Sequence, residues 1–146
     1  MYSKAENQKL KQEFWIDFAS KYPRKWILYD TKIKDFSFKF FADSKKAQVS
    51  IDIEHRSNDL RFQYFEKLQA LQSILNEEFI QDLIFEKNFT LENGKTISRI
   101  WIEKNEVNMN NRNHWEVIFE FFFEKMNALE LFYLEYDEFV KAVEKS

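Results

Sequence analysis

This chain has one Gly, one Pro and no Cys among its 146 residues. Turns and close backbone contacts that depend on glycine are therefore almost excluded. Aromatic residues, in contrast, are abundant, with 17 Phe, four Trp and six Tyr. Glycine-rich phosphate loops and cysteine-based metal sites need residues that the chain nearly or wholly lacks. Because each buried aromatic side chain removes roughly 150 to 250 Å² from water, a core can form without disulfides or metal. The composition therefore predicts an aromatic core and excludes most familiar catalytic motifs.

The length suits one domain, and no stretch rich in Pro, Gly or Ser divides the chain. The first residues lead into a charged amphipathic stretch, unlike a signal peptide, and no apolar run approaches the ~20 residues of a membrane span. A chain without Cys also suits a reducing compartment. We therefore expect residues 1–146 to form a single cytoplasmic α+β domain that spans no membrane and needs no cofactor.

A helix is predicted over about residues 3–22. Ser3 and Glu6 have the spacing of a capping box, and Pro23 cannot continue the helix. Apolar residues recur at every fourth position of this stretch, which places them on one helical face. They are Leu10, Phe14, Phe18 and Tyr22.

Two more helices are expected later in the chain. Ser57 can cap a helix that ends near Asn76, since apolar residues recur there at steps of three and four. From about Arg112 onward a helical stripe continues almost to the end of the chain. Because 30 residues in one helix would span ~45 Å, we expect a kink or a break around residues 127–130.

Alternating apolar and polar residues predict two hairpins. The segments 36–40 and 47–54 alternate on either side of a turn at residues 43–46. The segments 83–92 and 95–104 flank Asn93-Gly94, a typical type I′ hairpin turn in which both central residues need positive φ. The element order is then α-ββ-α-ββ-α, which predicts an α+β fold whose four-stranded sheet is antiparallel or mixed and packs against helices.

A two-residue turn at Asn93-Gly94 would set the register of the second hairpin. In that register Glu86 faces Trp101, and Phe89 faces Ser98 on the apolar side of the sheet. The same register places Lys87 among apolar neighbours. A β-bulge would resolve that conflict.

Charged residues near the middle of the predicted sheet form a candidate polar cluster. If the strands bring Asp52 or Glu54 close to Arg99, the guanidinium becomes a fixed cation among carboxylates. A structural ion-pair network is the preferred interpretation, and a site for an anionic ligand is the alternative. The candidate cluster comprises Asp52, Glu54, Glu86, Arg99 and Trp101.

A metal site is another interpretation of the acidic residues. Three of them are similar to the carboxylates of PD-(D/E)xK nucleases, which bind a divalent cation through oxygen ligands: Asp43, Asp52 and Glu54. The lysine that such nucleases place two residues after the second acid is absent, and Lys39 would have to replace it. Because alternating acids are also typical of a half-exposed strand, we prefer a solvated face and expect no bound metal.

A basic stretch is a candidate nucleic-acid contact. Residues 21–46 hold eight basic and three acidic side chains, whereas residues 116–144 hold eight acids and two lysines. Cations interleaved with aromatics are typical of surfaces that bind single strands, where bases stack and cations follow the phosphates. The alternative is pairing of these cations with the acidic C-terminal helix. The candidate residues are Arg24, Lys25, Trp26, Lys45 and Lys46.

Four phenylalanines stand close together in the predicted C-terminal helix, namely Phe119, Phe121, Phe122 and Phe123. A helix packed between a sheet and its neighbours is apolar over a wide arc, so a role in the core is the preferred interpretation. If some of these rings face outward, they would form the contact of a possible homodimer.

The packing residues occur in a recognisable order along the chain: Phe14-Trp15 with Phe18, the Val49–Ile53 strand, Phe65 with Leu68, Leu83–Glu86, and Ser98-Arg99-Ile100. In this order they resemble the bacterial domain of unknown function family numbered 4268. The resemblance covers nearly the whole chain and implies an α+β fold. Such domains occur alone or behind nuclease-like regions, which implies a link to nucleic-acid metabolism or defence. The resemblance transfers no catalytic residue.

No complete catalytic set is present, which favours a binding role over an enzyme without deciding it. The preferred hypothesis is an accessory or interaction module whose partner is an unknown protein or a nucleic acid. A degenerate metal-dependent nuclease and a structural self-associating domain are the alternatives.

Overall fold

The structure is a computed structural model that describes residues 3–145. Its main elements are α1 (Lys4–Lys21), β1 (Phe36–Ala42), β2 (Lys46–Ile53), α2 (Asn58–Ala70), β3 (Ile84–Thr90), β4 (Thr96–Asn105) and α4 (Trp115–Lys141). Shorter turns are α3 (Gln72–Ile74), the π-helical η1 (Leu75–Phe79), and the 3-10 helices η2 (Arg112–His114) and η3 (Ala142–Lys145). The fold is α+β, and the main elements follow the predicted order α-ββ-α-ββ-α.

The predicted capping box begins α1. The Ser3 hydroxyl accepts a hydrogen bond from the Glu6 backbone N–H, and the Glu6 carboxylate accepts one from the Ser3 backbone N–H. Three of the four predicted face residues of this helix are buried, and they are Leu10, Phe14 and Phe18. The helix therefore enters the core through the predicted face.

The four strands form one antiparallel sheet in the order β1-β2-β4-β3. Each hairpin contributes two neighbouring strands, and β2 and β4 join the hairpins at the centre of the sheet. In this central pair Ile51 lies opposite Ile100, and Asp52 lies opposite Arg99. Alternation along each strand then separates an apolar side from a polar side.

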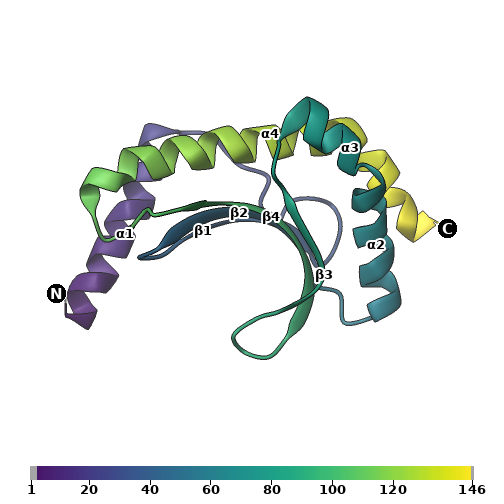
Figure 1. Cartoon of the computed structure of the whole chain (residues 1–146), viewed down its shortest axis with the longest axis horizontal. Helices are drawn as coiled ribbons and strands as arrows, with labels where there is room; N and C mark the ends of the chain where they lie inside the picture. The colour runs from purple at the N-terminus through teal and green to yellow at the C-terminus, as the bar shows by residue number, and fades with distance from the viewer. Residues whose placement is uncertain (1–2, 146) are drawn as a thin grey trace.

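Helices cover one side of this curved sheet. Figure 1 shows α4 lying along the convex side, with α1 near one end and α2 near the other, while the opposite side is concave. The side chains toward the helices form one core with α1, α2 and α4, and the sheet contributes Phe36, Phe38, Val49, Ile51, Ile53, Ile100 and Ile102 to it. Within residues 3–145, no helix covers the concave side.

The long helix α4 is not interrupted, so the predicted break around residues 127–130 is wrong. The helix holds 27 residues, which corresponds to a length of ~40 Å. It fits because it runs along the sheet, and its middle is tied to the segment after α1 through Asn127 and Glu130. Among residues 3–145, no helix combines the length and the apolar character needed to cross a membrane.

The second predicted helix ends earlier than expected. Ser57 caps α2 by accepting a hydrogen bond from the Leu60 N–H, as predicted, but α2 stops at Ala70. The short α3 and the π turn η1 then carry the chain to Phe79. The apolar stripe continues through this change, because Leu68, Leu71 and Leu75 are all buried.

The β3–β4 turn has three residues in its loop, so the predicted type I′ turn is wrong. Leu91 and Lys95 close the loop, the Gly94 N–H donates to the Leu91 carbonyl, and Gly94 alone in this loop has a positive φ, at 87°. A type I turn followed by glycine in the left-handed region is a common alternative for hairpins. The longer loop shifts the register, so Phe89 lies opposite Ile97 rather than Ser98.

A β-bulge lies between Glu86 and Phe89, as the conflict at Lys87 predicted. Before the bulge Phe85 lies opposite Ile100 on the helix side of the sheet. Beyond the bulge the facing of the strand is reversed, because Phe89 lies opposite Ile97 and contacts Trp101 and Arg99 on the other side. The bulge therefore moves one aromatic ring from the helix side to the concave side.

Candidate functional site

The candidate site is the concave face of the sheet, which we define by the side chains that point away from the helices. Strand pairing arranges them in rows across the sheet, because directly opposed residues share a face. The first row is Phe41, Gln48 and Glu103; the second is Lys39, Ser50, Trp101 and Ile84; the third is Ser37, Asp52, Arg99 and Glu86. Four of the five residues of the predicted polar cluster thus lie in two adjacent rows, with Glu86 opposite Arg99 and not, as predicted, opposite Trp101.

Arg99 and Asp52 form the centre of the concave face. Arg99 Nε lies 2.8 Å from Asp52 Oδ1, and Nη2 lies 2.9 Å from Oδ2, so the pair is bidentate. Only 1% of the Asp52 side chain is exposed, compared with 16% for Arg99. The predicted ion pair is therefore present and nearly buried. Arg99 Nη1 takes no part in it and keeps N–H groups for other acceptors.

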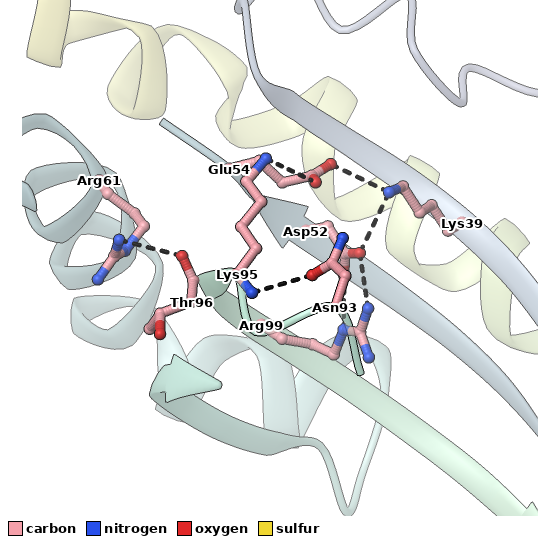
Figure 2. A network of polar contacts seen from close by, with 8 residues as sticks. All are labelled: Lys39, Asp52, Glu54, Arg61, Asn93, Lys95, Thr96 and Arg99. Atoms are coloured by element: carbon pink, nitrogen blue, oxygen red, sulfur yellow. Dashed lines mark hydrogen bonds and ion pairs between the residues drawn. The ribbon is translucent and has the colours of Figure 1, made fainter. Parts of the chain in front are cut away.

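Lys39 extends this ion pair toward the edge of the sheet. Its Nζ lies 3.4 Å from Asp52 Oδ2 and 3.0 Å from Glu54 Oε2 (Figure 2). Lys95, next to the β3–β4 turn, reaches Glu54 at 3.5 Å. Partial burial lowers the pKa of Lys39, but the hydrogen bond to Glu54 and the charge of Asp52 outweigh it and raise that pKa. Lys39 therefore remains a cation in the physiological range.

Glu103 organises the neighbouring row. The indole N–H of Trp101 donates to Glu103 Oε1 at 2.9 Å, and Gln48 Nε2 donates to the same oxygen at 3.0 Å. The hydrogen bond from Trp101, which outweighs burial, and the one from Gln48 lower the pKa of Glu103. The carboxylate is therefore ionised at neutral pH and can only accept hydrogen bonds.

Arg61 of α2 holds the bulge that shapes one end of the face. It donates to Asn88 Oδ1 at 2.8 Å, to Ser98 Oγ at 3.2 Å and to the Thr96 carbonyl at 3.3 Å, and Figure 2 shows it reaching Thr96. Ser98 Oγ in turn donates to the Lys87 carbonyl inside the bulge. These bonds satisfy polar groups that an irregular strand would leave without partners. Arg61 thereby fixes Phe89 over Trp101, with ring centres 5.4 Å apart.

A pocket of about 540 Å³ opens on the concave face between the β1–β2 hairpin and the β3–β4 turn. Its lining includes three cations, two acids and two aromatic residues of this face: Lys39, Lys46, Arg99, Asp43, Glu92, Phe41 and Phe89. Gln48, Ser50 and Asn93 add polar groups. Phe41 is 45% exposed on this face, so its ring is accessible to a ligand.

Several residues of this pocket were not among the candidates from the sequence. Alternation could have found Phe41 and Gln48, because the inward position of Phe40 and Val49 turns their neighbours outward. No local signal marks Phe89, since its direction depends on a bulge that distant Arg61 stabilises.

The alternative interpretation of the three acids as a metal site does not fit the geometry. Asp43 lies in the β1–β2 turn, where its Oδ1 accepts the backbone N–H groups of Lys45 and Lys46. Asp52 is six residues farther along β2 than Lys46, which separates the two carboxylates by ~20 Å. Among the residues that the structure describes, no group of three or more metal-ligating side chains is placed to hold an ion. Asp52 and Glu54 bind Arg99 and lysines instead.

The candidate nucleic-acid residues do not lie together, because some are on the helix side of the sheet and others are on the concave side. Arg24 donates to Glu130 at 2.6 Å and to Asn127 at 2.9 Å, so it pairs with the acidic helix α4. Trp26 lies under the Arg24 guanidinium and packs against Phe18 on the helix side. Lys45 and Lys46, in contrast, lie at the β1–β2 turn, and Lys46 lines the concave pocket.

Replacing Arg24 with glutamate is expected to lower the free energy of unfolding by about 2 kcal/mol, because it places a second carboxylate beside nearly buried Glu130. The neighbouring exposed Lys25 provides a matched control, and Lys25→Glu should change stability by less than about 0.5 kcal/mol. Urea unfolding followed by circular dichroism measures both. Equal effects of the two substitutions would show that Arg24 has no structural role.

The phenylalanine cluster of α4 belongs mainly to the core. Phe119, Phe121 and Phe122 are buried, as the preferred interpretation predicted. The large apolar side chains that α4 exposes lie elsewhere on the helix and are Val117, Leu131, Leu134 and Phe139. The three buried rings cannot form the contact of a homodimer, and the homodimer stays a prediction.

Comparisons with known proteins identify a family for the chain. The family described as "Domain of unknown function (DUF4268)" matches residues 10–137, which extend from the buried face of α1 through most of α4. No protein with a curated description and no solved structure matches the chain. The matched range contains both hairpins and the whole concave face, and the chain belongs to the DUF4268 family of domains of unknown function.

Proposed function

We propose that this domain is a non-enzymatic binding module whose concave face holds single-stranded nucleic acid. The pocket lined by Lys39, Lys46, Arg99, Phe41 and Phe89 carries this proposal. Single strands are bound by grooves in which cations meet phosphates and aromatic rings stack on bases, without any need for a basic protein overall. The net charge of −3 is therefore compatible with a local site of this kind.

Cations of the face can contact the phosphates of a strand at separate points, because they are interspersed with acids and do not form one positive patch. Lys39, Lys95 and Arg99 surround two carboxylates, which leaves one positive charge in that network. Each lysine and the arginine keep N–H donors that the ion pairs do not use. Lys46 adds a further cation at the other end of the pocket. Three or four phosphates can be contacted in this way.

Two central carboxylates of the face favour binding over catalysis. Asp52 is bound by Arg99 and Lys39, and Glu103 is bound by Trp101 and Gln48. A general base needs a free carboxylate within reach of a substrate proton. These two carboxylates instead position their partners, which supports a recognition role.

Fluorescence anisotropy with labelled DNA and RNA single strands of about 12 nucleotides tests the proposal, since one small binding domain covers roughly 4 to 16. We expect binding at low salt, with a log–log salt slope of about −2 for three phosphate contacts. Lys46→Glu should weaken binding roughly 5- to 10-fold, and Phe41→Ala about tenfold through lost stacking.

Lys11→Glu on the outer side of α1 gives the same change in net charge away from the pocket, and it should leave the affinity within about twofold of wild type. The proposal is refuted if neither oligonucleotide binds at low salt. It is refuted equally if Lys11→Glu and Lys46→Glu weaken binding to the same extent.

A further inference from the structure

The amide of Gln48 has a fixed direction. Its Nε2 donates to Glu103 Oε1 at 3.0 Å, and an ionised carboxylate cannot donate in return. The lowered pKa of Glu103 keeps it ionised, and the Trp101 indole N–H holds the same oxygen in place. Gln48 must therefore turn its nitrogen toward Glu103. Its other amide atom, the acceptor Oε1, is directed away from Glu103.

Gln48 lies in the floor of the concave pocket. Its neighbour across the strand pair is Phe41, which is 45% exposed, and Phe89 lines the opposite part of the same pocket. Gln48 itself is 9% exposed and lines this space. Among the contacts of residues 3–145, Gln48 Oε1 accepts no side-chain or backbone hydrogen bond. A base that stacks on Phe41 would thus have one edge next to the acceptor Gln48 Oε1.

We infer that Gln48 makes this pocket select cytosine and adenine, which carry an amino group at the 4- or 6-position of the ring, over uracil and thymine. The inference rests on the proposed function, because it assigns the bases that the same site prefers. Cytosine and adenine present N–H₂ donors where uracil and thymine present a carbonyl acceptor. An acceptor facing Gln48 Oε1 gains no hydrogen bond and is repelled, so the two pyrimidines are discriminated although they have the same size.

Glu103 acts as a positioning residue in this scheme. Its charge decides which end of the Gln48 amide faces the ligand, although Glu103 does not line the pocket. Ser50 also lines the floor, but a hydroxyl can rotate to donate or to accept, so it does not discriminate between the bases. The selectivity should therefore depend on two residues, Gln48 and Glu103.

Binding of cytidine and uridine oligonucleotides of about 12 residues to the full chain tests the inference. Wild type should bind the cytidine strand about tenfold more tightly, the discrimination typical of one well-placed base contact. Gln48→Met should remove this preference, so that the ratio of the two affinities falls below about twofold.

Glu103→Gln supplies a second, independent variant. The new amide can accept from Trp101 and donate to Gln48 Oε1, which lets Gln48 turn its nitrogen to the pocket. The preference for cytidine should then fall below about twofold or reverse toward uridine. A merely structural role of Glu103 would lower both affinities together and leave their ratio unchanged.

The outcomes separate this inference from the proposed function. If both strands bind with affinities within about twofold, or if Gln48→Met and Glu103→Gln keep the wild-type ratio, the inference is overturned while nucleic-acid binding stands. If neither strand binds, the proposed function fails and the inference fails with it.

Discussion

Replacing Phe14 with alanine should lower the free energy of unfolding by about 4 kcal/mol, the range for a fully buried phenylalanine. Phe14 has no exposed area, and its ring contacts those of Trp15, Trp115 and Phe119 at centroid distances of 4.9, 5.4 and 5.0 Å. Truncation removes these contacts and leaves a cavity where α1 meets α4. Urea unfolding followed by far-ultraviolet circular dichroism avoids a signal from the neighbouring tryptophans.

Phe41 gives the matched control for this prediction, because it is the same residue type on the opposite side of the sheet. Phe41→Ala should cost less than about 1 kcal/mol of stability, since the residue is already 45% exposed. The same substitution should weaken binding of a single strand, whereas Phe14→Ala should act on stability alone. Similar losses of stability in the two variants would contradict the division into a core side and a binding side.

Replacing Arg99 with methionine should cost about 3 kcal/mol of stability, because removing one partner of a buried pair leaves the other charge uncompensated. Asp52 would keep only Lys39, at 3.4 Å, and 1% of its side chain is exposed to water. Thermal and urea unfolding measure the effect. A loss below about 1 kcal/mol would show that water reaches Asp52 and that the pair is effectively a surface ion pair.

The double variant Asp52→Leu with Arg99→Met separates two contributions to stability: the cost of leaving one buried charge unpaired, and the net contribution of the ion pair. Exchange of a whole buried ion pair for apolar residues is often close to neutral, so the double variant should be more stable than Arg99→Met alone. Lys39 keeps Glu54 as its partner in this background. If the losses of Asp52→Leu and Arg99→Met simply add in the double variant, the two side chains are not energetically coupled, which would contradict a buried ion pair.

Local patterns predicted the elements of this fold because their causes are local. The capping box at Ser3 and Glu6 satisfies backbone groups three residues apart, and alternation in β1 and β2 reflects the pleat of each strand. The break expected in α4 was wrong for the opposite reason. Whether a long helix stays straight depends on the surface along which it packs, and that surface is a sheet distant in sequence.

The site was predicted only in part, because its geometry combines local and distant causes. The Asp52–Arg99 pair follows from which strands are neighbours, and the two acids and the arginine were already candidates. Asp43 lies in the turn, as the sequence indicated, but it is far from the other two acids because distance in a hairpin grows with each residue from the strand to the turn. Phe89 was assigned to the wrong face, since the bulge that turns it depends on Arg61 of another element.

The four tryptophans allow one measurement to test whether the concave face is the binding surface. Trp101 lies on that face, whereas Trp15 stacks on Phe122, Trp26 stacks on Phe18, and Trp115 donates to the Met109 carbonyl on the helix side. The indole N–H signals of nitrogen-15-labelled protein can be followed by NMR during titration with a cytidine oligonucleotide. We expect the Trp101 signal to move while the other three stay in place. Movement of those three signals with Trp101 unchanged, or no movement in any signal, would contradict a concave nucleic-acid site.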